Sequence, residues 1–322
     1  MSEVQMKQFP KIDLHCHLDG SLPLGTVREL LNREVQIEEL QVADDCQNLA
    51  QYLEKFELPL QCLQTEKGLE MASYQFMESV AKEGIKYIEV RFAPLLSVHQ
   101  HLSCRQVIEA VLQGLKKGGQ AYGVYHNVIV CAMRHLSDEQ NIEMIKTARE
   151  FFGNGVCALD LAGDEAAYPM VNFRELFAQA NRWELPFTIH AGECGSVENI
   201  IEAISCGARR IGHGIALSGN PLAQKLCQEK RIGIEMCPVS NMQTKAVVSL
   251  EVYPINEFLN QGLAITINTD NRTVSNTSIT REIAFVKKHW KITDENIEMM
   301  MKNAVELSFA EDGVKQQLFS YF

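Results

Sequence analysis

The sequence predicts an α/β protein with the (β/α)8 TIM-barrel architecture, in which residues 1–322 form a single domain. Three observations support this: eight short apolar segments, helical patterns between them, and no Pro/Gly/Ser-rich linker that would divide the chain. The 322 residues and 46% hydrophobic content are ample for one large core. We therefore expect parallel strands covered by helices, with a functional site at the carboxyl ends of the strands.

The eight predicted strands are apolar on both faces, as expected for a parallel sheet that is covered on both sides. In chain order they are residues 11–17, 85–92, 125–132, 156–161, 187–191, 210–213, 232–236 and 263–269. Helical patterns between them cover residues 106–118, 173–180, 199–206 and 222–229, and closing helices are predicted within residues 276–322.

The interval between the first two strands is too long for one crossover helix. Residues 18–84 are therefore expected to form a helical insertion over the carboxyl-end face of the barrel. Within it, four apolar residues have the spacing i, i+3, i+4 and i+7, which predicts an amphipathic helix packed on the barrel. They are Leu49, Tyr52, Leu53 and Phe56.

The chain is acidic, with 30 Lys and Arg, 41 Asp and Glu, and a formal net charge of −11. General nucleic-acid binding is therefore not expected, because it depends on basic residues that neutralise phosphates. No apolar run of about 18 residues is present, and the first residues lack the apolar segment of a signal peptide. These features predict a cytoplasmic protein with no membrane contact and a preference for small or cationic partners. Scattered apolar residues define no interface, so no oligomeric state is predicted.

The ten cysteines are scattered and contain no C-x-x-C pair, which argues against a zinc ribbon or a dithiol redox site. Several, such as Cys131 and Cys157, lie inside apolar runs. This placement is typical of reduced, buried thiols in a reducing compartment.

Two histidines end the first predicted strand. Because residues i and i+2 of a strand point to the same side, His15 and His17 should project together into the barrel mouth, where their imidazoles suit a metal such as Zn²⁺. His99 and His101 have the same spacing but follow Pro94 in an irregular stretch, where a loop is predicted.

Further polar residues follow strands five, six and eight, namely His190, Glu193, His213 and Asp270. The carboxyl ends of barrel strands meet on one face, so these groups predict a metal site. Strand four ends without the lysine that bridges two metals in binuclear barrel hydrolases, which favours one metal ion. Three histidines and one aspartate around Zn²⁺ would leave room for an activated water, with Glu193 and His213 available for proton transfer.

Seven stretches of the sequence resemble, in order, the adenosine deaminase family of the metal-dependent amidohydrolases. They are residues 14–21 (LHCHLDGS), 89–94 (EVRFAP), 160–165 (DLAGDE), 190–193 (HAGE), 212–214 (GHG), 237–241 (CPVSN) and 268–270 (NTD). The matching stretches run over nearly the whole chain.

This resemblance implies a purine-nucleoside deaminase with one Zn²⁺ per chain, whose ligands are His15, His17, His190 and Asp270. It also implies that Glu193 protonates the purine N1, while His213 and Asp270 orient and deprotonate the attacking water. Adenosine, and 2′-deoxyadenosine as well, would yield inosine or deoxyinosine and ammonia. A glutamate that donates a proton near pH 7 needs a raised pKa, which burial can supply.

The resemblance further places Asp19 at the ribose 5′-hydroxyl, the Gly163 backbone at the purine N3, residue 271 at N7, and His17 beside the substrate. Position 271 departs from the usual aspartate. Here it is Asn271, whose amide donates a hydrogen bond at any pH. The adjacent Arg272 is expected to be a solvated or ion-paired surface residue.

The resemblance also implies that the helix over residues 49–56 walls the pocket as a lid. Glu89 and Arg91 on strand two are expected to belong to an ion pair inside the barrel, rather than to contact substrate.

Three alternatives to adenosine deamination are considered. An adenine deaminase, or a deaminase of another 6-aminopurine nucleoside, would use the same site. Asp19, however, favours a ribose hydroxyl over a free base and opposes a 5′-phosphate. A catalytically silent nucleoside-binding protein would not need the intact Glu193. A nucleic-acid base deaminase would carry H-x-E and P-C-x-x-C motifs, which are absent.

Overall fold

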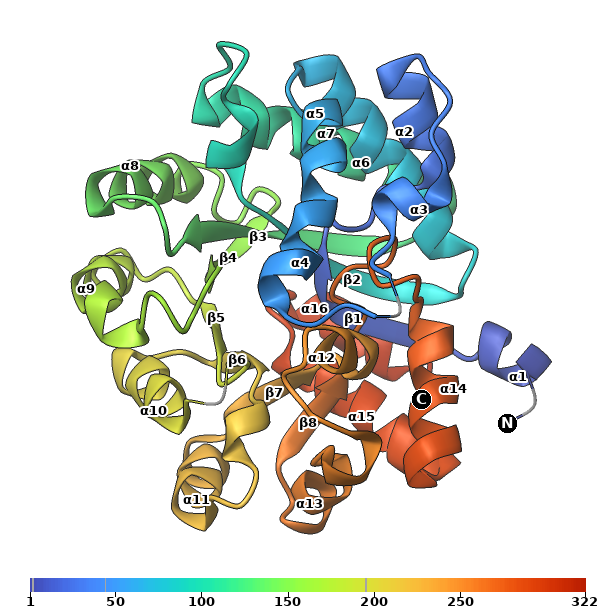
Figure 1. The fold of residues 1–322 in the computed structure, drawn as a ribbon, viewed down its shortest axis with the longest axis vertical. Helices are drawn as coiled ribbons and strands as arrows, with labels where there is room; N and C mark the ends of the chain where they lie inside the picture. Colours follow the sequence, from blue (N-terminus) through green and yellow to red (C-terminus); the bar gives the residue numbers. More distant parts are fainter. Residues whose placement is uncertain (2, 44, 195) are drawn as a thin grey trace.

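The computed structural model describes residues 1, 3–43, 45–194 and 196–322 and confirms the predicted α/β barrel, with parallel strands inside a ring of helices (Figure 1). The strands are β1 (Lys11–His17), β2 (Ile85–Phe92), β3 (Tyr125–Met133), β4 (Val156–Ala162), β5 (Thr188–Ala191), β6 (Arg210–His213), β7 (Gly233–Met236) and β8 (Ala264–Ile267). All eight predicted strands are present, with ends that differ by at most a few residues.

The strands form two four-stranded parallel sheets, β1–β4 and β5–β8, which meet at two seams. At the β8–β1 seam, the backbone N–H groups of His17 and Asp270 donate to the carbonyls of Asp270 and His15, both at 2.7 Å. At the β4–β5 seam, a single parallel bridge joins Leu159 to Phe187, just before β5 begins. The carboxyl-end half of this second seam therefore depends on side chains.

Strand β8 is shorter than predicted because its continuation turns into the site. Asn268 follows the strand, and its side chain accepts a hydrogen bond from the Leu14 N–H at 3.0 Å and donates to the Met236 carbonyl. Asp270 then adopts a left-handed backbone conformation with φ 57°. These bonds replace the strand ladder and aim the Asp270 side chain into the barrel mouth.

Most of the covering helices follow the strands in alternation. They are α1 (Glu3–Gln8), α7 (Cys104–Tyr122), α8 (Asp138–Arg149), α9 (Arg174–Arg182), α10 (Val197–Cys206), α11 (Pro221–Lys230), α12 (Pro238–Gln243), α13 (Ile255–Asn260), α14 (Ile279–Trp290), α15 (Asp294–Leu307) and α16 (Asp312–Phe319). Helix α7 extends beyond its predicted core because Ser103 and Gln106 form a capping box and Gly123, with φ 70°, ends the helix. Among the described residues, no helix combines the length and apolar character needed to cross a bilayer.

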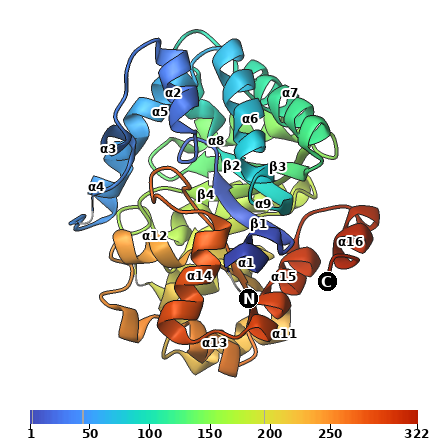
Figure 2. The same ribbon diagram turned by 90° about the vertical axis from the view of Figure 1, so that its right-hand side faces the viewer.

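Between β1 and β2 the chain forms a series of helices rather than one crossover. They are α2 (Leu24–Leu31), α3 (Ile37–Leu40), α4 (Leu49–Leu53), α5 (Glu57–Cys62) and α6 (Glu66–Ala81), with a 3₁₀ turn at Glu54–Phe56. Helices α3 and α4 lie on one side of the barrel and α16 lies on the opposite side (Figure 2).

Residues 49–56 are helical, as predicted, but they form an α-helix followed by a 3₁₀ turn rather than one α-helix. The α-helix begins after Asn48, whose side chain accepts from the Gln51 N–H, and it ends at Leu53. Pro59 explains the 3₁₀ turn that follows, because its ring opposes a helical position of the carbonyl four residues earlier.

Candidate active site

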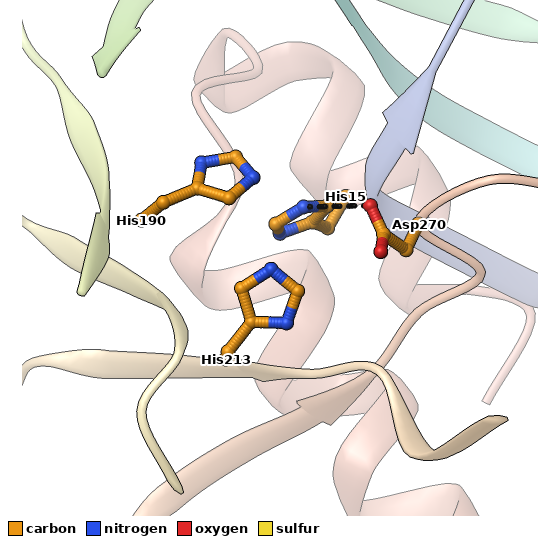
Figure 3. A group of neighbouring side chains, drawn as sticks. All are labelled: His15, His190, His213 and Asp270. Carbon is orange, nitrogen blue, oxygen red and sulfur yellow. Dashed lines mark ion pairs between the residues drawn. The ribbon is translucent and has the colours of Figure 1, made fainter. Parts of the chain in front are cut away.

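Four side chains converge at the carboxyl ends of the strands. His15 of β1, His190 of β5, His213 of β6 and Asp270 after β8 point toward one another (Figure 3), and their candidate ligand atoms all lie within 4.8 Å. All four residues are buried. The Nε2 atom of His15 is buried without a hydrogen-bond partner. Imidazole nitrogens and a carboxylate oxygen are the donors that Zn²⁺ prefers, so this buried set fits a metal ion.

His17 completes the cluster. Its Nε2 lies 3.2 Å from His190 Nε2 and 3.4 Å from Asp270 Oδ1, and His15 Nε2 is also 3.4 Å from Asp270 Oδ1. Burial, opposed in part by the charge of Asp270, holds the pKa of His17 well below its usual range, so the imidazole is in its neutral, metal-binding form. The structure therefore brings together the four residues predicted as ligands and adds His213 to the same group.

Carboxylates orient two of the imidazoles. His15 Nδ1 lies 2.8 Å from Glu235 Oε2, and His190 Nδ1 lies 2.9 Å from Asp160 Oδ2. Burial alone would raise the pKa of both carboxyl groups, but neighbouring positive charges, including that of Arg91, hold each pKa well below its usual range. Both carboxylates are thus ionised, and their charges beside the ring Nδ1 atoms favour the orientation in which the rings face the cluster.

Two further polar residues support the site. The Ser240 hydroxyl donates to Asp270 Oδ2 at 2.5 Å, and the Asn241 amide donates to His213 Nδ1 at 2.9 Å. Sequence reasoning assigned no role to these two residues, nor to Asp160 and Glu235. Ser240 and Asn241 lie in the CPVSN stretch, and Glu235 lies on the strand just before it. Their place at the carboxyl end of a strand was the one feature of the sequence that could have indicated a role in the site.

A cavity of about 360 Å³ opens beside the cluster, a volume suited to a small molecule. Every residue predicted to contact substrate or to form the lid lines it: His17, Asp19, Leu49, Tyr52, Leu53, Phe56, Gly163 and Asn271. None of the described lining residues is Lys or Arg. The lining is acidic and otherwise largely apolar, which favours an uncharged ligand over an anionic one.

Asp19 and Asn271 each present a free acceptor. Asp19 Oδ1 and Asn271 Oδ1 are buried without a hydrogen-bond partner, which is costly unless a ligand supplies one. Burial raises the pKa of Asp19 to about 7. Gly20 is required beside them, because a Cβ at that position would lie 1.9 Å from Asn271 Oδ1.

Glu193 lies on the turn after β5, where Gly192 has φ 72°. Its side chain lines the cavity, and Oε2 is 3.8 Å from His213 Nε2. The residue is only 8% exposed.

The segment that carries α4 is attached to the loop after β8. The Tyr52 hydroxyl lies 2.6 Å from Ser275 Oγ, and the Val42 N–H donates to the Val274 carbonyl at 2.9 Å. Tyr52 and Val274 belong to a small apolar cluster separate from the main core, whereas Leu53 is 40% exposed. The helix α4 that walls the pocket therefore packs mainly on the loop after β8, which also carries Asp270.

The ion pairs expected for three charged residues are present, but the structure corrects the exposure of Arg272 and the partner of Glu89. Arg272 is buried rather than superficial, and it pairs with Glu83 in the turn after α6. Glu89 and Arg91 lie in the barrel interior, but Glu89 pairs with Arg210. Side chains two residues apart on a strand project side by side into the barrel, where carboxylates and guanidinium groups from other strands reach them first.

Known proteins are similar to this chain over nearly its whole length. The family described as Adenosine deaminase matches residues 10–322. The adenosine deaminase of Enterococcus faecalis is 40% identical, covering 99% of this chain and 97% of that protein. The adenosine deaminase of Clostridium botulinum strain Okra is 42% identical, covering 99% and 98% respectively.

Solved structures share the fold. The N6-methyl-AMP deaminase of Arabidopsis thaliana is 26% identical and has a TM-score of 0.87, covering 99% of this chain and 98% of that one. An amidohydrolase from Burkholderia ambifaria, solved with bound Zn, is 18% identical and has the same TM-score, covering 99% and 90%.

Proposed function

The chain belongs to the adenosine deaminase family, and from this membership we propose that it catalyses the zinc-dependent hydrolytic deamination of adenosine and 2′-deoxyadenosine. The products are inosine or deoxyinosine and ammonia, as in purine salvage and catabolism. One observation carries the proposal: Glu193 lies beside a buried histidine–aspartate cluster in a cavity whose described lining has no basic side chain except histidine.

One zinc ion would be held by His15, His17, His190 and Asp270. The buried, mutually facing donor atoms and the unpartnered His15 Nε2 support this assignment. When bound, the ion supplies a water whose pKa is lowered toward neutrality.

Glu193 is the proton donor to the purine N1, which makes C6 electrophilic. Its side chain lines the cavity and is 3.8 Å from His213 Nε2, a position from which the carboxyl group can reach a bound purine ring. Asp270 accepts the proton of the attacking water, and Ser240 holds its other oxygen. Because Asn241 donates to Nδ1 of His213, the proton of the neutral ring is on Nε2, which can donate to the oxygen that adds to C6.

The pocket selects a neutral nucleoside. Asp19 accepts a hydrogen bond from the ribose 5′-hydroxyl, and the Asn271 amide donates to N7. Gly163, with φ 109°, leaves its backbone uncovered for the purine N3. A phosphate in place of the hydroxyl would meet the Asp19 carboxylate, so neither nucleotides nor nucleic acids are expected partners.

Residues 1–322 act as one domain, in which the insertion over residues 18–84 contributes the lid. Leu49, Tyr52, Leu53 and Phe56 close the pocket and exclude water. We assign the protein to the cytoplasm, which is supported by its ten free cysteines, because a reducing compartment keeps such thiols unpaired.

A substrate panel tests the function. Ammonia release is measured with adenosine, 2′-deoxyadenosine, adenine, AMP and cytidine, with and without a chelator. Both nucleosides should react, and the chelator should abolish their turnover. Adenine and AMP should have kcat/KM values at least about 100-fold lower than adenosine. Adenine lacks the ribose hydroxyl that Asp19 binds, and the phosphate of AMP is repelled by the Asp19 carboxylate. Fastest turnover of adenine would identify an adenine deaminase, and no turnover by zinc-loaded protein would identify a silent binding protein.

A further inference from the structure

Glu165 is a buried carboxylate that accepts three of its four hydrogen bonds from the turn that carries Glu193. Its Oε1 accepts from the Gly192 N–H at 2.7 Å, and its Oε2 accepts from the N–H groups of Glu193 at 3.0 Å and Cys194 at 3.2 Å. The Asn199 amide donates a fourth bond at 2.8 Å. Three consecutive backbone donors therefore converge on one side chain.

This contact lies where the barrel has no strand ladder. Glu165 follows β4 and the turn follows β5, and among the described residues the backbone pairing of these two strands is the bridge between Leu159 and Phe187, near the start of β5. On the β6 side the Gly192 carbonyl accepts from the Ala216 N–H at 2.9 Å, whereas the β4 side of the turn has no ladder bond among the described residues. Glu165 supplies across this seam the hydrogen bonds that a ladder would otherwise make.

Glu165 is itself held firmly. It is 2% exposed, and Asn199, which donates to it from α10, also accepts from the Met170 N–H at 2.8 Å. The described residues that line the cavity do not include Glu165. An effect of Glu165 on the reaction is therefore indirect.

We infer that Glu165 is the positioning residue for Glu193: its carboxylate fixes the turn at Gly192, Glu193 and Cys194, and so sets the distance of the Glu193 carboxyl group from the substrate and from His213. The inference rests on the proposed role of Glu193 as proton donor. A carboxylate is needed because its two oxygens only accept, whereas an amide would place a donor against the N–H groups of the turn.

The test is Glu165→Gln, which keeps the size of the side chain and removes one acceptor. The expected result is a kcat about 10- to 100-fold lower, a KM for adenosine within about threefold of the wild type, and one zinc per chain. Glu257→Gln is the matched control, because Glu257 accepts from the Gly219 N–H and the Ser218 hydroxyl in a loop outside the cavity. This control should lower the melting temperature and leave kcat unchanged.

A double-variant cycle separates positioning from general damage. If Glu165 acts through Glu193, adding Glu165→Gln to Glu193→Gln should change kcat by less than about twofold. A folded Glu165→Gln protein with wild-type kcat, or a double variant that loses a further tenfold, would overturn the inference. Near-normal kcat of Glu193→Gln alone would instead refute the proposed role of Glu193.

A milder variant covers the case in which Glu165→Gln does not fold. Asn199→Ala removes one of the four donors to Glu165. It should lower kcat about threefold to tenfold in the wild type and leave kcat unchanged in the Glu193→Gln background. Equal losses in both backgrounds would overturn the inference.

Discussion

Arg91 and Glu235 form a fully buried ion pair of 2.8 Å through the same carboxylate oxygen that lies 2.8 Å from His15 Nδ1. The other end of the guanidinium lies 2.8 Å from Asp160, which in turn orients His190. One arginine therefore links the two carboxylates that aim two imidazoles at the cluster, so the geometry of the site depends on the charge balance of the barrel interior.

This link predicts that Glu235→Gln weakens metal binding. His15 would lose its charged partner, and zinc affinity should fall about 10- to 100-fold, measured by competition with a chelator. The free energy of unfolding should also fall by about 3–5 kcal/mol, because Arg91 and Arg210 lose a buried partner. Glu89→Gln, which also unpairs Arg210, is the control and should destabilise the fold without weakening zinc binding. Unchanged zinc affinity in folded Glu235→Gln would contradict the orienting role.

Glu193→Gln should retain one zinc per chain and lower kcat by at least about 100-fold, because an amide cannot transfer a proton to the purine N1. Steady-state kinetics with adenosine and elemental analysis of the same sample measure the two effects. Loss of the metal together with activity would place Glu193 in the metal site rather than beside the substrate.

His17 and His213 lie in the same cluster, and their variants should differ. His17→Ala should lose zinc, because a ligand is removed. His213→Ala should keep zinc and lose at least about 100-fold in kcat, because proton transfer is impaired. Elemental analysis separates the two outcomes. Full zinc occupancy in His17→Ala, with an empty site in His213→Ala, would show instead that His213 is the metal ligand and that His17 is not.

Asp19→Ala should lower kcat/KM for adenosine about 10- to 100-fold, the effect of losing a hydrogen bond to a charged group. The low turnover of adenine should change by less than about threefold, because a free base has no ribose hydroxyl. The two substrates are compared in the same ammonia-release assay. Equal losses on both would show that Asp19 does not contact the ribose.

Glu282 predicts a pH dependence of stability. Burial raises the pKa of this carboxyl group to about 8, from 4.5 in its ordinary state. Between these values the unfolded chain has released a proton that the folded chain retains, so stability falls as pH rises. Glu282→Gln should remove this loss and be more stable than the wild type by roughly 2–4 kcal/mol at pH 8, with little difference near pH 4.5. Denaturant unfolding across this range is the measurement, and a pH-independent difference would contradict the prediction.

Periodicity along the chain was sufficient to predict the barrel. Apolar runs located all eight strands, and the bounds of β1, β2 and β6 agree with the prediction. Helix ends were less predictable, because caps such as Ser103 and the proline at position 59 decide them locally. The candidate site was predictable because parallel strands bring their carboxyl ends together, so that His15, His190 and Asp270 can meet from distant positions.

The sequence by itself determined which residues carry the chemistry, since donors of the right kind follow successive strands. Only the tertiary structure decided how these donors are held. Arg91 bridges Asp160 and Glu235, Glu165 clamps the turn of Glu193, and Arg272 is buried against Glu83. The physical reason is that a buried charge pairs with the opposite charge that lies nearest to it in the folded protein. Strand periodicity predicts the direction in which a side chain points, but it does not predict which charged group lies beside that side chain.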